Sequence, residues 1–239
     1  MSERVWLPYC GPAPAPDDWL ARWNGDPLLL LALGAAALWA WRRGDARAPF
    51  WGGLACLALI FVSPLCALSS ALFSARVVHH VLLTAIAAPL IAWGLPRLRV
   101  GGSAAIWAAA QALLFWLWHA PAPYAAALSS DAVYWAMQLS LFASALGFWA
   151  ALRRASAPFA VGLLLAMMVQ MGLLGALITF AGTPLYAPHA VTTIAWGLTP
   201  LEDQQLAGLI MWAPAAGLYL AAALWQGGRL FPRGRRAGA

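Results

Sequence analysis

The stretch S-A-R-V-V-H-H-V-L-L-T-A-I-A-A-P-L-I-A-W-G-L (74–95) decides the fold class of this chain. Arg76 is its one residue of the Asp, Glu, Lys and Arg types, and a helix of about 20 mostly apolar residues is long enough to cross a bilayer. The whole chain of 239 residues has the same character, since 63% of it is hydrophobic and 9% is charged. A soluble domain carries about 25% charged residues. We therefore expect most of this surface to face lipid.

Further apolar stretches, separated by loops rich in proline, arginine or acidic residues, accompany this one. They predict an all-α fold, a polytopic membrane helical bundle of about seven transmembrane helices. We expect one integral membrane domain over residues 1–239, made of an outer polar lead (1–25), the bundle (26–226) and a basic cytoplasmic tail (227–239). The expected spans are 27–41, 49–68, 74–95, 104–120, 132–152, 158–181 and 204–226.

The arginines predict the orientation of the bundle. They follow the first, third and fifth expected spans and recur in the tail, whereas the loops after the fourth and sixth spans carry acids and no arginine. Positive residues mark the cytoplasmic side of a membrane protein, so we expect the N-terminus outside and the C-terminus inside. Short clusters between apolar spans are also not the basic surface that binds nucleic acid. The arginines concerned are Arg42, Arg43, Arg47, Arg97, Arg99, Arg153, Arg154, Arg229, Arg233, Arg235 and Arg236.

With this orientation, all four histidines fall toward the outer face. His79 and His80 lie in the third span, His119 ends the fourth, and His189 lies in the long loop before the seventh. Ionisable groups within a bilayer are costly and usually functional, and imidazole is the commonest metal ligand. The pattern predicts a metal site at an accessible outer rim.

Softer side chains near that face could complete such a site. Met171, Met211 and Cys10 are the candidates, and thioether and thiolate ligands favour Cu(I). Each has a plainer interpretation, because methionines in apolar helices usually pack and Cys10 could instead form a disulfide with Cys66. A membrane histidine, too, often serves only to hydrogen-bond neighbouring helices.

Arg76 and the acids before the last span have alternatives of their own. Arg76 could extend to the interface or pair with Asp131 or Glu202. Glu202 and Asp203 suit the N-terminus of the last helix, where negative charge is favourable.

Three motifs make the chain resemble the multi-spanning CtaG family of cytochrome c oxidase assembly proteins. The first is the histidine-bearing stretch S-A-R-V-V-H-H-V-L-L-T-A-I-A-A-P-L (74–90), and the second is W-H-A-P-A-P-Y (118–124). The third joins T-P-L-Y-A-P-H (183–189) to L-T-P-L-E-D-Q-Q-L-A-G-L-I-M-W (198–212). The resemblance covers most of 74–212.

The resemblance implies a bacterial inner-membrane protein that matures haem–copper oxidases by supplying copper to the active-site copper centre of an oxidase subunit, together with other copper chaperones. The chain departs from the family pattern at Arg76, where members often carry histidine. It also departs at Tyr134 and Gln138, where many members carry histidines. The residues it nominates are His80, His119, Tyr124, Asp203, Gln204, Gln205, Met211 and Trp212.

The leading hypothesis is therefore a copper-binding assembly factor that holds Cu(I) with His80, His119 and a soft ligand, without haem and without catalysis. No serine–histidine–acid set or phosphate-binding loop suggests an enzyme. One alternative is a membrane cytochrome with His80 and His119 as axial haem ligands, and another is a copper transporter. A retinal protein is excluded because the chain has no lysine for a Schiff base.

Overall fold

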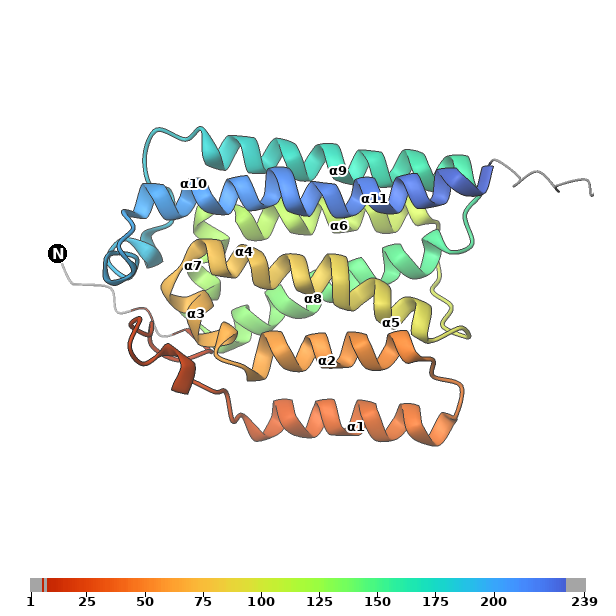
Figure 1. The fold of residues 1–239 in the computed structure, drawn as a ribbon, viewed down its shortest axis with the longest axis horizontal. Helices are drawn as coiled ribbons and strands as arrows, with labels where there is room; N and C mark the ends of the chain where they lie inside the picture. The colour runs from red at the N-terminus through yellow and green to blue at the C-terminus, as the bar shows by residue number, and fades with distance from the viewer. Residues whose placement is uncertain (1–5, 7, 231–239) are drawn as a thin grey trace, which may run out of the picture.

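The computed structural model describes residue 6 and residues 8–230, and this part of the chain contains helices and no strands (Figure 1). The prediction of an all-α fold is therefore confirmed. Residues 1–5 and 7 of the predicted lead, and Arg233, Arg235 and Arg236 of the predicted tail, lie outside the described residues. The α-helices are α1 (Pro27–Arg43), α2 (Ala48–Val62), α3 (Leu65–Ala71), α4 (Phe73–Val81), α5 (Ala88–Gly94), α6 (Ala104–His119), α7 (Pro121–Ala127), α8 (Asp131–Leu152), α9 (Ala157–Thr179), α10 (Pro200–Ile210) and α11 (Ala216–Gly227).

The expected spans all coincide with helical segments, but they differ in length. Among the described residues, four continuous helical segments are long and apolar enough to cross a membrane, and a fifth is reached if the bent pair α2 and α3 counts as one span. Helix α1 has 17 residues and α6 has 16, both short for about 30 Å of hydrocarbon at 1.5 Å per residue. The four segments are Phe73–Gly94, Asp131–Leu152, Ala157–Thr179 and Pro200–Gly227.

The second expected span, 49–68, is not one straight helix. Helix α2 ends at Val62, α3 begins at Leu65, and the two axes differ by 48°. Pro64 lies at the break, where its ring removes a backbone N–H and conflicts with a continuing helix. The hydroxyl of Ser63 donates to the carbonyl of Leu59 and accepts from the N–H of Leu65, so it satisfies backbone groups that the break leaves free.

Two long segments stay continuous through π-helical turns. One is η2 (Leu82–Ala87), between α4 and α5, and the other is η5 (Met211–Ala215), between α10 and α11. Pro89 follows the first and Pro214 lies inside the second. Because proline cannot donate to the i−4 carbonyl, the wider turn absorbs the missing hydrogen bond without ending the helix.

The arginine-rich connections meet at one end of the bundle, on the right in Figure 1. The guanidinium of Arg153 donates to the carbonyls of Leu95 at 3.2 Å and Leu98 at 2.8 Å, and that of Arg154 to Val100 at 2.7 Å. Asp45 pairs with Arg43 and Arg97 at 3.2 Å each. The arginines that predict the orientation thus also fasten the connections at this end.

The opposite end is covered by two segments without long helices. Residues 8–26 and the loop 182–199 lie there, on the left in Figure 1. A disulfide joins Cys10 to Cys66 at the start of α3, and the indole of Trp196 in the loop donates to the carbonyl of Pro14 at 3.2 Å. The loop is therefore an ordered cap. We call it the outer cap (182–199), after the side of the membrane on which the sequence predicts it.

Helices α9 and α10 approach each other at two glycines. A Cβ on Gly208 would lie 2.5 Å from the carbonyl oxygen of Gly175, and a Cβ on Gly175 would lie 2.7 Å from that of Gly208. Such close backbone contact requires residues without side chains. This crossing sets how closely α10, the helix that carries Asp203, lies against α9.

Candidate functional site

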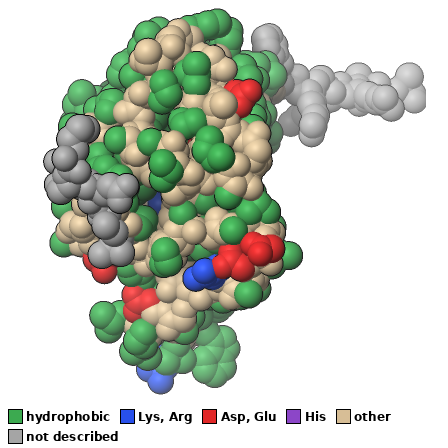
Figure 2. All heavy atoms as spheres, turned by 90° about the vertical axis from the view of Figure 1, so that its left-hand side faces the viewer, with side chains coloured by type: hydrophobic (Ala, Val, Ile, Leu, Met, Phe, Trp, Pro, Cys, Tyr) green, Lys and Arg blue, Asp and Glu red, His purple; other side chains and the backbone are tan. Residues whose placement is uncertain are grey.

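All four histidines are enclosed, which corrects the expectation of an accessible outer rim. His79, His80, His119 and His189 are 0%, 1%, 3% and 2% exposed. Figure 2 shows the capped end, where apolar and uncharged groups cover most of the face and no histidine is visible outside the grey residues. Residues 8–26 and the outer cap lie at this end of the bundle. The histidines therefore form a buried polar cluster beneath that cap.

His80 and His119 come together, as the copper-binding hypothesis requires. Their ring centroids lie 5.5 Å apart, with His80 on the second turn of α4 and His119 on the last residue of α6. Two metal–nitrogen bonds of about 2 Å each need donor nitrogens about 4 Å apart. Rings at this separation can meet that requirement, so the two imidazoles can share one ion.

The tautomer of His119 leaves a nitrogen free to bind. Its Nδ1 lies 2.7 Å from the carbonyl oxygen of Phe115, and because a carbonyl only accepts, Nδ1 carries the proton. The lone pair is then on Nε2, which is buried and has no hydrogen-bond partner among the described residues. A histidine whose other nitrogen donates to a backbone carbonyl is oriented as metal ligands usually are.

His79 and His80 face different surroundings because adjacent helical residues point about 100° apart. The ring of His79 packs edge-on against Phe61 of α2, with centroids 4.9 Å apart, and lies 5.9 Å from His80. Its contacts are thus on the α2 side of α4, while His80 faces His119. The sequence-based preference for His80 over His79 as the partner of His119 agrees with this arrangement.

Helix α8 contributes two fully buried residues that sequence reasoning noted only as departures from the family. The side-chain amide of Gln138 lies 3.5 Å from Nε2 of His80, and the ring of Tyr134 lies under the guanidinium of Arg76. Polar side chains inside an apolar span are the signal that identifies such positions. Gln138 therefore belongs to the site as a neighbour of His80.

His189 is brought to the cluster but uses both of its nitrogens there. Nε2 accepts from the hydroxyl of Tyr124 at 2.7 Å, and Nδ1 donates to the carbonyl of Ala71 at 3.1 Å. Thr192 donates to that same carbonyl at 2.6 Å, and the hydroxyl of Tyr186 donates to the carbonyl of His119 at 2.8 Å. These bonds hold the outer cap to the ends of α3, α6 and α7, so the loop interpretation of His189 fits better than a ligand role.

Glu202 and Asp203, the two acids in the first turn of α10, have different roles. Glu202 forms a capping box with Thr199 at the start of α10, as the helix N-terminus interpretation expects. Asp203 is buried and instead accepts from the backbone N–H groups of Phe73 and Ser74, at 2.7 and 3.2 Å, and from the Ser74 hydroxyl. Asp203 thus caps α4, the helix that carries the histidine pair, from another helix.

Of the remaining nominated residues, one has a clear anchoring contact and two do not reach the histidines. Gln204 accepts from the N–H of Leu185 at 2.7 Å and donates to the carbonyls of Ile178 and Thr183, so it fastens the start of the outer cap. Trp212 is 46% exposed on the outside of the bundle. Gln205 is half-buried on α10.

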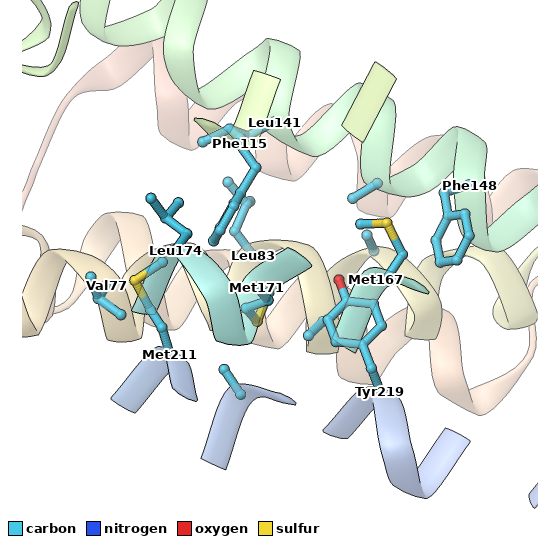
Figure 3. Packing of buried hydrophobic residues seen from close by; sticks show 14 of the residues in the cluster. Val77, Leu83, Phe115, Leu141, Phe148, Met167, Met171, Leu174, Met211 and Tyr219 are labelled. Carbon is cyan, nitrogen blue, oxygen red and sulfur yellow. The ribbon is translucent and has the colours of Figure 1, made fainter. Parts of the chain in front are cut away.

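The soft-ligand candidates lie elsewhere. Met171 and Met211 point into the hydrophobic cluster beside Leu174, Phe115 and Val77 (Figure 3), where they pack as apolar side chains. Cys10 is bonded to Cys66, so it offers no thiolate in this state, and the prediction that Cys10 completes a metal site is corrected. Within the described chain, no three side chains of histidine, cysteine, aspartate or glutamate are arranged to hold a metal ion.

Arg76 follows neither of its expected alternatives. It is 0% exposed, so it does not extend to the interface, and none of the ion pairs among the described residues includes it. Its guanidinium lies 5.2 Å from the ring centroid of Tyr134, and its hydrogen-bonding neighbours are the neutral hydroxyls of Tyr124 and Tyr134. A buried cation therefore lies one turn from the histidine pair.

Comparison with known proteins agrees with the family suggested by the motifs. Residues 29–231 match the family described as cytochrome c oxidase caa3 assembly factor. Comparisons with curated proteins and with solved structures gave no match. The matched range covers the helices, the outer cap and every histidine, so the chain belongs to the family of cytochrome c oxidase caa3 assembly factors.

Proposed function

We propose that this assembly factor binds Cu(I) between His80 and His119 and hands it to the oxidase subunit that carries the active-site copper. The observation that supports this proposal is the 5.5 Å separation of the two rings. Both imidazoles are buried, and His119 presents an unprotonated Nε2 with no other partner among the described residues. Imidazole is a suitable ligand for copper.

A site with two protein ligands suits copper as cargo. Cu(I) accepts low coordination numbers, so two imidazoles can hold it while leaving a position open for a third donor. A donor from the client can then bind before the first bonds break, and copper moves by ligand exchange. Structural zinc sites, in contrast, take four protein ligands, and no such set is present among the described residues.

The direct test is metal analysis of the purified protein after loading with Cu(I) under reducing conditions that leave the disulfide intact. We expect wild type to retain copper and both His80→Ala and His119→Ala to lose it. Met171→Leu and His189→Gln are matched controls, because Met171 packs in the apolar core and both nitrogens of His189 are engaged. Equally negligible copper in wild type and in the histidine variants would refute copper binding, and a Soret band would instead support the haem-binding alternative.

Delivery needs a separate experiment. Copper-loaded protein is mixed with the copper-free oxidase subunit, and the copper content of each is measured after separation. We expect transfer from wild type and none from His80→Ala or His119→Ala. Copper binding without transfer would indicate that the protein stores copper and does not donate it to the oxidase subunit.

We also propose that the chain crosses the bacterial inner membrane seven times with its histidine cluster toward the outer side. The arginine-tied connections lie at one end of the bundle, and the Cys10–Cys66 disulfide lies at the other. Positive loops favour the cytoplasm, and disulfides persist in oxidising compartments. Reporter fusions after residues 45, 100, 155 and 192 test this topology, with the first three expected inside and the last outside.

A further inference from the structure

Arg76 presents a charge that the described structure does not balance. Its side chain is completely enclosed, and none of the ion pairs among the described residues includes it. Arginine cannot lose its proton in a protein, so the group stays cationic. Burial of an uncompensated ion is costly because no solvent or counter-charge replaces its hydration.

The neighbouring groups cannot supply that counter-charge. Tyr134 offers the face of its ring, and the hydroxyls of Tyr124 and Tyr134 lie beside the guanidinium as neutral hydrogen-bonding groups. Both tyrosines are neutral at physiological pH. Asp203, the buried acid of this region, is engaged by the Phe73 and Ser74 N–H groups and by the Ser74 hydroxyl.

The imidazoles around Arg76 supply no negative charge that could balance the guanidinium. His79 follows Arg76 by three residues and His80 by four, so both lie on the next turn of α4. His79 contacts the backbone of Ile60, whereas Nδ1 of His80 has no partner in the part of the chain that the structure describes. A neutral imidazole carries one N–H, so His80 adds an unpaired N–H to the cluster.

We propose that this cluster binds one small monovalent anion, of the size and charge of chloride, held by the guanidinium of Arg76. One negative charge balances one guanidinium, whereas a divalent oxyanion would leave a buried charge of its own. The complete enclosure of Arg76, Tyr134 and His79 favours an ion of about the size of a water molecule. The site does not depend on copper, because the charge of Arg76 requires compensation whether or not His80 and His119 hold a metal.

The test is the anion dependence of thermal unfolding, followed by tryptophan fluorescence of the full-length protein in detergent without added copper. Chloride is compared with gluconate, which is too large to enter, at constant sodium concentration. A ligand that binds only the folded state raises the midpoint as its concentration increases. We expect chloride to raise the midpoint of wild type relative to gluconate, with a shift that grows as chloride passes its dissociation constant, and we expect Arg76→Met to lose the shift.

Arg153→Met is the matched control. The guanidinium of Arg153 donates to backbone carbonyls at the other end of the bundle, so this variant should keep the chloride shift whatever its own stability. A wild-type midpoint that is the same in both salts, or an Arg76→Met variant that keeps the shift, would overturn the proposal.

A second measurement on wild type does not rely on the variant folding. Crystals grown in bromide in place of chloride should show an anomalous peak within hydrogen-bonding distance of the Arg76 guanidinium. Ordered water or an empty volume at that position in bromide would show that hydration, not an anion, accompanies Arg76, and would overturn the assignment.

Discussion

The carboxylate of Asp203, on α10, accepts a hydrogen bond of 2.7 Å from the backbone N–H of Phe73, the first residue of α4. Sequence separation between the two is 130 residues. The N–H groups at the start of a helix have no partner within it, and here another helix supplies one. Helix α4 carries Arg76, His79 and His80, so this bond holds the start of the histidine-bearing helix in place.

Removal of that cap should destabilise the protein and disturb the proposed copper site. Asp203→Ala leaves two backbone N–H groups and the Ser74 hydroxyl without their acceptor, and we expect a loss of about 1–3 kcal/mol from the free energy of unfolding. Thermal or denaturant unfolding in detergent measures it. Glu202→Ala, which removes an exposed partner from a capping box, is the control and should lose less. Equal losses of unfolding free energy in the two variants would show that the cap between α10 and α4 stabilises the protein no more than the exposed capping box does.

The hydroxyls of two buried tyrosines should differ in their contribution to stability. Tyr124→Phe removes the donor to Nε2 of His189 and should cost about 1–3 kcal/mol, because a buried acceptor is left unsatisfied. The equally buried hydroxyl of Tyr219 lies beside the hydroxyl of Thr84, which also bonds to the carbonyl of His80, so Tyr219→Phe leaves no group wholly unsatisfied and should cost less. Midpoints of unfolding of the two variants, measured side by side, check this difference, and a reversed order would contradict it.

The outer cap should weaken in acid because of His189. Burial lowers the pKa of His189 to about 3, whereas the unfolded chain protonates near 6.5. The folded state therefore binds fewer protons, and its stability falls as the pH drops below about 6.5, until the pH nears 3. Between pH 7 and pH 5 the loss from this residue is about 2 kcal/mol.

Comparison of wild type with His189→Gln isolates that contribution from those of other groups. The variant has no titrating imidazole at this position, so its unfolding midpoint should fall less steeply between pH 7 and pH 5. Both proteins are measured in the same detergent at constant salt. Parallel pH profiles would mean that His189 does not titrate as its burial requires.

The disulfide between Cys10 and Cys66 should be a major support of the capped end. It joins residues 56 apart in sequence, and a cross-link over a loop of that length removes about 4 kcal/mol of unfolded-state entropy in the chain-entropy description. Cys10→Ala/Cys66→Ala should lower the unfolding midpoint, while Cys56→Ala, at the free cysteine, should change it little. Maleimide labelling of the denatured, unreduced protein should modify one cysteine, and labelling of three would show that the bridge is absent.

Part of the candidate site could be predicted from the sequence. The motif around 118–124 and the histidines of 74–95 nominated His80 and His119 together, and the structure brings their rings to 5.5 Å. Gln138 appeared in the sequence only as a departure from the family. Its contact with His80 depends on how α8 crosses α4, which no local pattern records.

Other predictions failed for reasons of packing. Histidines near span ends were expected at an accessible rim, but 8–26 and the outer cap cover them. Arg76 was expected at the interface or in an ion pair. It is instead enclosed, and none of the ion pairs among the described residues includes it. Whether a residue near a helix end is exposed depends on what folds over that end, and hydropathy along one segment does not contain this information.

The sequence by itself determined the helical fold class, the positions of the apolar segments and the distribution of arginine. These are local properties, because each lipid-facing helix must satisfy its own backbone and cover its own length with apolar side chains. The tertiary structure alone decided the cap that Asp203 places on α4 and the enclosure of the histidines with Arg76. Each of these depends on close contact between segments far apart in the chain, such as the approach of Gly175 to Gly208, and the side-chain directions at such contacts are fixed only when all the helices are packed together.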